Sequence, residues 1–234
     1  IRTNLQFVNV DNPGRALVVT SAAPGDGKTT VACNLAIALA QTGQKVCLVE
    51  SDLRRPRVME YIQLAAGPGL TEVLAGQLNL ENALQSWGRG MLSVLPPGAI
   101  PPNPSEILGS HQMAQVVASL KSSFDMVILD TPPLLAVSDA SVLASQTDGA
   151  VVVVRYGKSS RDSVRNAVGA LEQINAKVLG TVLNAVPVKR GGGYGYGYGY
   201  GYGYVSDSKG KSKNTVQAPD ESAVAPTSSG SSGA

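Results

Sequence analysis

The chain is poor in the residues that build disulfide frameworks and zinc sites. Its 234 residues include two cysteines and one histidine. Cys33 and Cys47 lie in apolar runs and lack the CxxC spacing of a zinc site, so we expect buried free thiols of a reducing compartment. His111 falls within an expected helix, and we predict a surface or core residue there and not a catalytic one.

Long apolar runs and a large net charge are also missing. No stretch approaches the roughly 20 apolar residues of a membrane-spanning helix, and the start at Ile1 lacks the layout of a signal peptide. We therefore expect a soluble fragment whose upstream part could hold a membrane anchor. Lys and Arg total 19 against 17 Asp and Glu, so the net charge of +2 gives no support to a nucleic-acid partner, and we predict none.

Short β-branched apolar runs alternate with longer amphipathic segments along most of the chain. This pattern predicts an α/β fold, with a mostly parallel central sheet flanked by helices. The expected strands are Ala16–Thr20, Lys45–Glu50, Met91–Leu95, Met126–Asp130, Ala150–Val154 and Val178–Leu183. The expected helices are Lys28–Gln41, Pro104–Lys121, Asp139–Gln146 and Arg161–Ile174, the last with an apolar stripe of Val164, Val168, Leu171 and Ile174 that we expect in the core.

The composition changes sharply near Arg190, where aliphatic residues nearly vanish. A Gly-Tyr repeat over 191–204 is followed by a mixture of Ser, Lys, Pro and Asp. Such a segment cannot bury enough apolar surface to fold alone. We predict a folded domain over 1–188 and a disordered C-terminal tail over 189–234.

The segment that follows the first expected strand is typical of a phosphate-binding loop. Gly25, Asp26 and Gly27 precede Lys28 and Thr29 at the start of an expected helix. Backbone N–H groups and the helix N-terminus would face the phosphates, with Lys28 reaching the β and γ oxygens and the Thr29 hydroxyl binding Mg²⁺. Ala22 stands where the common motif has its first glycine.

Three acidic residues end two further strands of the expected sheet. Glu50 and Asp52 are two residues apart, so on an extended strand they would point the same way, at the edge where α/β ligands bind. They would bind magnesium or take a proton from a hydroxyl; in the alternative reading they form salt bridges to Arg54 and Arg55. Asp130 ends a hydrophobic strand, where a buried carboxylate is costly without a cation, and this favours a Walker B role.

Taken together, these motifs resemble the bacterial tyrosine kinases (BY-kinases) of capsule and exopolysaccharide synthesis. The resemblance covers about 1–188 and depends on six segments in order: 2–7, 24–29, 50–56, 129–133, 137–140 and 180–184. It implies a P-loop kinase with ATP and Mg²⁺ as cofactors. The family usually has Asp at the position of Glu50, so Asp52 is the acid we expect to matter most.

The resemblance also assigns site residues. It implies catalytic roles for Lys28, Asp52, Glu50 and Asp130, and metal binding by Thr29, Asp52 and Asp130. The nucleotide-binding residues would be Gly25, Asp26, Gly27, Lys28, Thr29, Thr30 and Asn184. Asn184 resembles the position near the adenine; its alternative is a simple turn residue at the end of a strand.

The tyrosine tail supports a kinase by a separate route. Tyr194, Tyr196, Tyr198, Tyr200, Tyr202 and Tyr204 alternate with glycine and are the predicted phosphate acceptors. A flexible strand of about 20 residues spreads over about 25 Å, enough to visit the site of a neighbouring copy. The expected partners are other copies of the chain in a ring, a transmembrane activator or upstream membrane segment, and a tyrosine phosphatase. The expected location is the cytoplasmic face of the bacterial plasma membrane.

Two other functions remain open from the sequence. A Min/Par-like P-loop ATPase switch shares the fold, but those proteins carry a lysine at the position of Ala23. A nucleotide-binding scaffold that has lost catalysis is the second alternative, and Glu50 is the residue that favours it. Phosphotyrosine formation separates the kinase from both.

Overall fold

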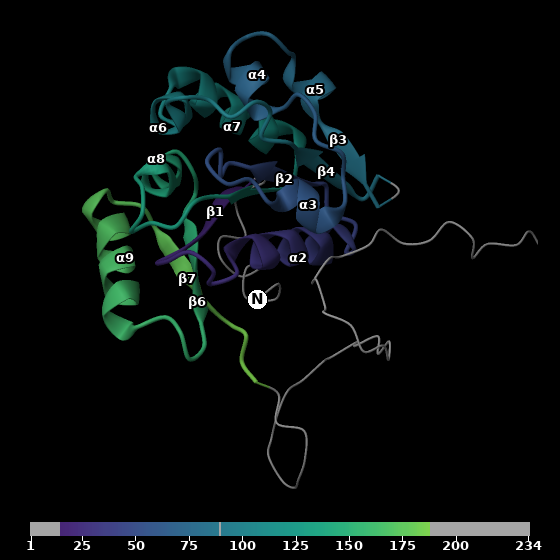
Figure 1. Cartoon of the computed structure of the whole chain (residues 1–234). Helices are drawn as coiled ribbons and strands as arrows, with labels where there is room; N and C mark the ends of the chain where they lie inside the picture. Colours follow the sequence, from purple (N-terminus) through teal and green to yellow (C-terminus); the bar gives the residue numbers. More distant parts are fainter. Residues whose placement is uncertain (1–14, 89, 188–234) are drawn as a thin grey trace, which may run out of the picture.

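The computed structural model describes residues 15–88 and 90–187, which build a seven-stranded sheet with helices on both faces (Figure 1). The strand order is β3-β4-β2-β5-β1-β6-β7, and every neighbouring pair is parallel except β3 with β4. The strands are β1 Arg15–Ser21, β2 Val46–Glu50, β3 Gln85–Trp87, β4 Leu92–Leu95, β5 Met126–Asp130, β6 Ala150–Arg155 and β7 Val178–Asn184. The predicted α/β fold with a mostly parallel sheet is confirmed.

The burial of the three central strands explains their amino-acid sequences. Every residue of β2 and β5 is buried, and so is every residue of β1 after its first. Strands covered on both faces need apolar side chains at successive positions, which is why these segments are continuous apolar runs without alternation.

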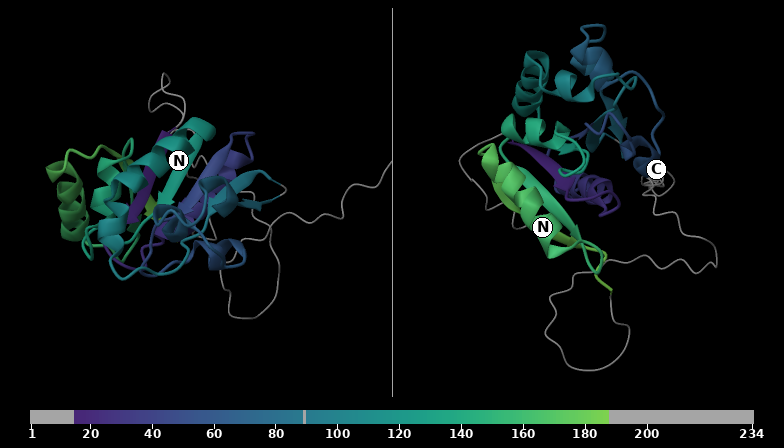
Figure 2. Two further views of the ribbon diagram at one scale, coloured as in Figure 1. Left: turned by 90° about the horizontal axis from the view of Figure 1, so that it is seen from above. Right: turned by 60° about the vertical axis from the view of Figure 1, so that its left-hand side comes forward.

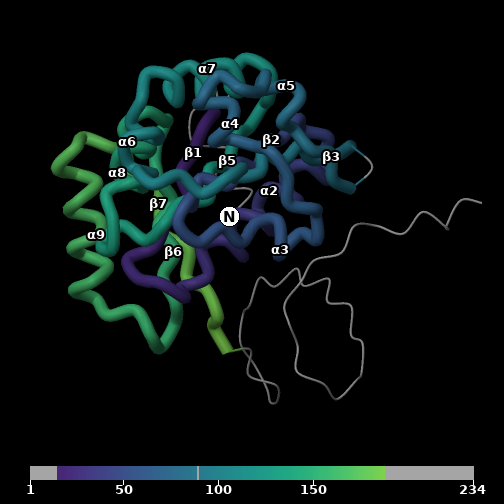
Figure 3. Tube along the Cα trace, turned by 45° about the horizontal axis from the view of Figure 1, so that its top comes forward, coloured from purple at the N-terminus to yellow at the C-terminus, as the bar shows by residue number. Residues whose placement is uncertain are grey.

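Helices cover the two faces of the sheet unequally. The helices are α2 Lys28–Ala40, α3 Val58–Ile62, α4 Leu70–Leu74, α5 Leu80–Ala83, α6 Pro104–Leu108, α7 His111–Ser123, α8 Asp139–Ser145 and α9 Arg161–Gln173. Buried residues of α2 and α3 pack on one face, and those of α7, α8 and α9 pack on the other. Figure 2 shows α9 running along β6 and β7, and Figure 3 shows α4 beside α7.

Several expectations for the elements were wrong. The helix expected over 104–121 is two helices, because Gly109 ends α6 and the Ser110 hydroxyl caps α7 by accepting the N–H of Met113 at 3.2 Å. The short elements β3, α3, α4 and α5 were not predicted at all. On α9, Leu171 is buried as expected, but Val164 and Val168 are only partly buried, and Ile174 is 37% exposed because the helix ends at Gln173.

The sheet order brings the chemical residues to one edge. β1 lies between β5 and β6, and the loops that follow β1, β2 and β5 leave from the same carboxyl edge. Ligands of open α/β sheets bind at such a point. None of the helices in the described ranges has the length and hydropathy needed to cross a membrane. The proposed boundary at 188, the tail and its six tyrosines lie outside the described residues.

Candidate active site

The loop between β1 and α2 has the backbone shape of a phosphate cradle. Gly25 and Gly27 have φ angles of 83° and 94°, which residues other than glycine rarely adopt. Gly27 is also the residue before α2, so the free N–H groups of the first helical turn open toward the loop. Ala22, at the position of the usual first glycine, is buried in the core and fits there.

Neighbouring strands hold this loop in place. The Asn184 amide, at the end of β7, donates to the Asp26 carbonyl at 3.0 Å. Arg155, at the end of β6, donates to the Gly25 carbonyl at 2.7 Å. A Cβ on Gly27 would lie 2.1 Å from the Asn184 amide nitrogen, so a larger residue would have to displace the Asn184 side chain. Asn184 therefore supports the loop in this structure, and its predicted contact with adenine stays a prediction.

Lys28 and Asp52 meet at the centre of the site. The Lys28 Nζ lies 3.0 Å from Asp52 Oδ2, and both side chains are largely buried. Burial alone would lower the pKa of Lys28, but the charges of Asp130 and Asp52 outweigh it and raise that pKa above its usual value. Lys28 is therefore a fixed positive charge at the mouth of the phosphate loop.

Thr29 and Asp130 form the second polar pair. The Thr29 hydroxyl donates to Asp130 Oδ2 at 2.6 Å. Burial raises the pKa of Asp130 to about 6, although Lys28 and Thr29 oppose the shift. Asp130 Oδ1 is buried and has no hydrogen-bond partner among the described residues. An orphaned carboxylate oxygen beside a threonine hydroxyl fits a hydrated Mg²⁺, whose ligands are oxygen atoms.

Glu50 lies beside Asp130 in the sheet register but points elsewhere. Its side chain is fully buried, and its carboxylate accepts backbone N–H groups of Asp52 at 3.2 Å, Arg57 at 2.6 Å and Val58 at 2.7 Å. Burial and the nearby Asp130 raise the pKa of Glu50 well above its usual value, although the hydrogen bonds from the Arg57 and Val58 N–H groups lower it. β2 ends at Glu50, so the expected common direction of Glu50 and Asp52 is not observed.

Arg54 does not pair with either acid of its own motif. Its guanidinium donates to both carboxylate oxygens of Asp139, at 2.8 and 3.1 Å, and to the Ser105 hydroxyl at 3.0 Å. Ser105 also donates to Asp139. The alternative reading, in which Glu50 and Asp52 form salt bridges to Arg54 and Arg55, does not hold for Arg54, and Asp52 pairs with Lys28.

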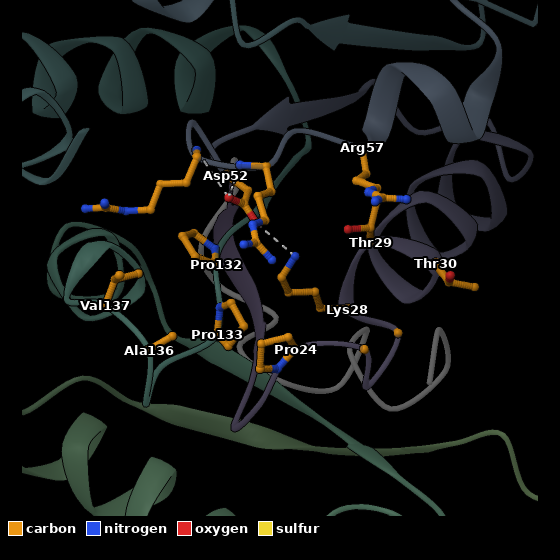
Figure 4. A pocket seen from close by; sticks show the side chains of 14 residues that line it. Pro24, Lys28, Thr29, Thr30, Asp52, Arg57, Pro132, Pro133, Ala136 and Val137 are labelled. Atoms are coloured by element: carbon orange, nitrogen blue, oxygen red, sulfur yellow. Dashed lines mark hydrogen bonds and ion pairs between the residues drawn. The ribbon is translucent and has the colours of Figure 1, made fainter. Parts of the chain in front are cut away.

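These elements enclose a pocket of about 650 Å³ (Figure 4). Figure 4 shows Lys28 and Asp52 directed toward each other, with Pro132 and Pro133 on one side and Thr29 on the other. The lining residues are Pro24, Gly25, Gly27, Lys28, Thr29, Thr30, Asp52, Arg54, Arg55, Arg57, Pro132, Pro133, Ala136 and Val137. The lining therefore combines basic side chains with a group of apolar ones.

Most of the residues expected from the sequence gather here. Gly25, Gly27, Lys28, Thr29, Thr30 and Asp52 line the pocket, and Asp130 contacts Thr29 from beneath it. The sequence reasoning missed the roles of Arg155 and of the Arg54, Ser105 and Asp139 cluster. Asp139 belongs to the 137–140 motif. An acidic residue at the start of an expected helix was the only feature in the sequence that pointed to this cluster.

Comparison with known proteins agrees with this geometry. A family model described as an AAA domain matches residues 14–183. Tyrosine-protein kinase YwqD of Bacillus subtilis (strain 168) is 43% identical over 184 residues, which are 79% of this chain and 78% of YwqD. The chain spans only 26% of the tyrosine-protein kinase etk of Escherichia coli (strain K12), at 37% identity.

Among solved structures, a tyrosine kinase domain is more similar to this chain than a cell division ATPase is. The kinase domain of the Escherichia coli tyrosine kinase ETK matches with a TM-score of 0.77 at 37% identity, over 84% of this chain and 77% of that one. The Pyrococcus furiosus cell division ATPase MinD matches with 0.63 at 30% identity, over 73% and 71%. The P-loop, the acids that surround it and these similarities together show that the chain belongs to the bacterial tyrosine-protein kinase family.

Proposed function

We propose that this chain transfers the γ-phosphate of ATP to tyrosine hydroxyls. The observation that carries the proposal is the contact between Lys28 and Asp52 inside the pocket. It places a cation suited to phosphate and a carboxylate suited to a hydroxyl proton within one hydrogen bond of each other.

The first step is binding of the triphosphate. The N–H groups of the glycine-containing loop and of the first turn of α2 would face the phosphate oxygens. Lys28 is already charged and held at the loop, so the β and γ oxygens would draw its ammonium group away from Asp52. The loop needs little rearrangement, because Asn184 and Arg155 hold its backbone carbonyls.

The second step is the transfer. The tyrosine oxygen bonds to the γ-phosphorus, the bond from that phosphorus to the bridging oxygen of ADP breaks, and the phenolic proton passes to Asp52. Release of Lys28 from Asp52 frees Oδ2 to accept that proton. Asp130 and Thr29, with Asp52, would hold Mg²⁺, which when bound neutralises charge on the phosphates.

The acceptor ring has a suitable surface within the pocket. Pro132, Pro133, Ala136 and Val137 form an apolar wall of the same pocket that Asp52 lines. Burial of an aromatic ring on such a wall is favourable, and the phenol would then point to the polar centre. We assign Tyr194, Tyr196, Tyr198, Tyr200, Tyr202 and Tyr204 of a neighbouring copy as acceptors. The first five have a glycine on both sides and Tyr204 has one before it, and glycine adds no side chain that would crowd the ring.

The cellular setting follows from the same family membership. We propose that copies of the chain assemble in a ring, with a transmembrane activator or an upstream membrane segment that raises activity, at the cytoplasmic face of the plasma membrane. A tyrosine phosphatase would return the tail to its unmodified state. The output would be control of polysaccharide polymerisation and export.

The decisive experiment is intact mass of the purified chain after incubation with MgATP, with and without the activator segment. Stepwise gains of one phosphate that map to 194–204, and that vanish in Lys28→Met, are expected. Phosphate release without a gain in protein mass under either condition would instead support an ATPase switch. Nucleotide binding with neither product would support a scaffold.

A further inference from the structure

Glu50 occupies the position of a family acid but is not exposed to the pocket. Its side chain has no accessible surface, and it is absent from the pocket lining, which includes its neighbour Asp52. A general base must come within hydrogen-bond reach of the proton it removes. In this arrangement Asp52 meets that condition and Glu50 does not.

Both oxygens of the Glu50 carboxylate bind the loop that follows β2. Oε1 accepts the N–H of Asp52 at the start of this loop, and Oε2 accepts those of Arg57 and Val58 at its end. One side chain thus joins the two ends of the 51–58 segment. Such charge-assisted bonds to buried N–H groups are among the stronger ones in proteins.

The segment closed in this way carries the polar wall of the pocket. Asp52 Oδ1 accepts the N–H groups of Arg54 at 3.3 Å and Arg55 at 3.0 Å, while its Oδ2 contacts Lys28. Arg54, Arg55 and Arg57 all line the pocket. The placement of Asp52, and of the backbone from which these arginine side chains extend, therefore depends on a segment whose two ends Glu50 holds.

We propose that Glu50 is a positioning residue of the kinase site, which closes the 51–58 loop and so aims Asp52 and the arginines at the substrates. The inference rests on the proposed function but concerns a different residue and a different readout. It also accounts for glutamate at this position. An aspartate carboxylate would sit about 1.5 Å nearer the backbone, too far to keep both the Arg57 and Val58 contacts.

Two substitutions separate positioning from base catalysis. Glu50→Asp keeps a carboxylate but loses reach. Glu50→Gln keeps the reach and one acceptor oxygen, which can still serve Arg57 and Val58; its NH2 group then faces the Asp52 N–H, and that end of the contact is lost. A positioning residue is therefore rescued better by glutamine, and a base is rescued better by aspartate. Glu172→Gln is the matched control, because Glu172 is an exposed residue of α9 and does not line the pocket.

The first readout is amide hydrogen exchange of residues 52, 57 and 58, together with the affinity for a non-hydrolysable ATP analogue with Mg²⁺. Neither measurement needs phosphate transfer, so their result is independent of whether the chain proves to be a kinase. We expect Glu50→Asp to speed exchange at 57 and 58 and to weaken analogue binding by about tenfold, as loss of one to two hydrogen bonds implies. Glu50→Gln should change both less, and Glu172→Gln should change neither.

The second readout is kcat and KM for the full chain with its activator. We expect kcat in Glu50→Gln to exceed that in Glu50→Asp. We also expect the plot of kcat against pH for Glu50→Gln to keep both the acidic and the basic limb that the unsubstituted chain shows. The proposal is overturned if Glu50→Asp exchanges and binds like the unsubstituted chain while Glu50→Gln alone loses kcat. Because Glu50→Gln preserves side-chain size, it keeps the exchange experiment decisive even if Glu50→Asp does not fold.

Discussion

Arg54 and Asp139 are joined by two hydrogen bonds, although 85 residues separate them. The guanidinium Nε and NH2 groups reach the two Asp139 oxygens at 2.8 and 3.1 Å. Arg54 belongs to the loop after β2, and Asp139 is the fully buried first residue of α8. The contact ties the basic wall of the pocket to the segment that carries its apolar wall.

Removal of the Asp139 charge should destabilise the fold. Asp139→Asn leaves a partly buried guanidinium without its bidentate partner, and we expect a loss of about 2 kcal/mol in the free energy of unfolding. The single Trp87 is buried, so urea unfolding can be followed by its fluorescence. Asp162→Asn, which breaks the exposed pair with Arg165, should cost less than about 0.5 kcal/mol. Equal losses in the two variants would contradict the role of the buried pair.

The same pair predicts how stability depends on pH. Burial alone would raise the pKa of Asp139, but hydrogen bonds from Arg54 and Ser105 outweigh it and hold that pKa below its usual value. A lowered folded pKa stabilises the protein above the unfolded pKa of about 3.9, and that stabilisation is lost as pH falls through the folded value. Unfolding curves of Asp139→Asn and the unsubstituted chain should therefore differ at pH 7 and converge in acid. A constant difference from pH 7 down to acid would argue against this assignment.

Substitution of Gly27 should weaken nucleotide binding. Gly27→Ala adds a Cβ at 2.1 Å from the Asn184 amide nitrogen and strains a left-handed residue, so we expect at least about tenfold weaker ATP binding by calorimetry. Gly43→Ala has similar strain, at φ 86°, but no atom within 4 Å. That control should lose about 1–2 kcal/mol of stability and bind ATP normally. Partial recovery in Gly27→Ala with Asn184→Ala would separate the clash from the strain.

Magnesium dependence should reside in Thr29. Thr29→Ala removes the hydroxyl that donates to Asp130. ATP binding by this variant should then be equally weak in Mg²⁺ and in EDTA, whereas Thr29→Ser should keep the magnesium effect. Retention of a full magnesium effect by Thr29→Ala would show that the metal is held without this hydroxyl.

Both thiols should be inert in the folded protein. Cys33 and Cys47 have no exposed surface, and burial raises the pKa of each thiol far above its usual value. A thiol reagent at neutral pH should react only at the rate of unfolding, and two equivalents should react at once in denaturant. Rapid labelling of the native chain would contradict the buried placement.

The sequence predicted most of the parallel sheet, since each buried strand is an unbroken apolar run that needs no partner to be recognised. It predicted the phosphate loop for a related reason: Gly25, Gly27, Lys28 and Thr29 are contiguous in the chain, and the two glycines set the local backbone geometry. The short elements β3, α3, α4 and α5 were not predicted, because segments of at most five residues carry too little periodicity. Asn184 and Arg155 could not be assigned to the loop, since their contacts join residues more than 100 positions apart.

Local pattern thus determined where phosphate can bind, because a strand, a glycine loop and a helix start are contiguous in the chain. Only the tertiary structure decided which acid faces the pocket. Glu50 and Asp52 have similar chemistry and are two residues apart, and strand periodicity no longer relates their directions once β2 ends at Glu50. The distinction comes from burial: the Glu50 carboxylate is surrounded by N–H groups of a loop that closes over it, while Asp52 remains opposite Lys28.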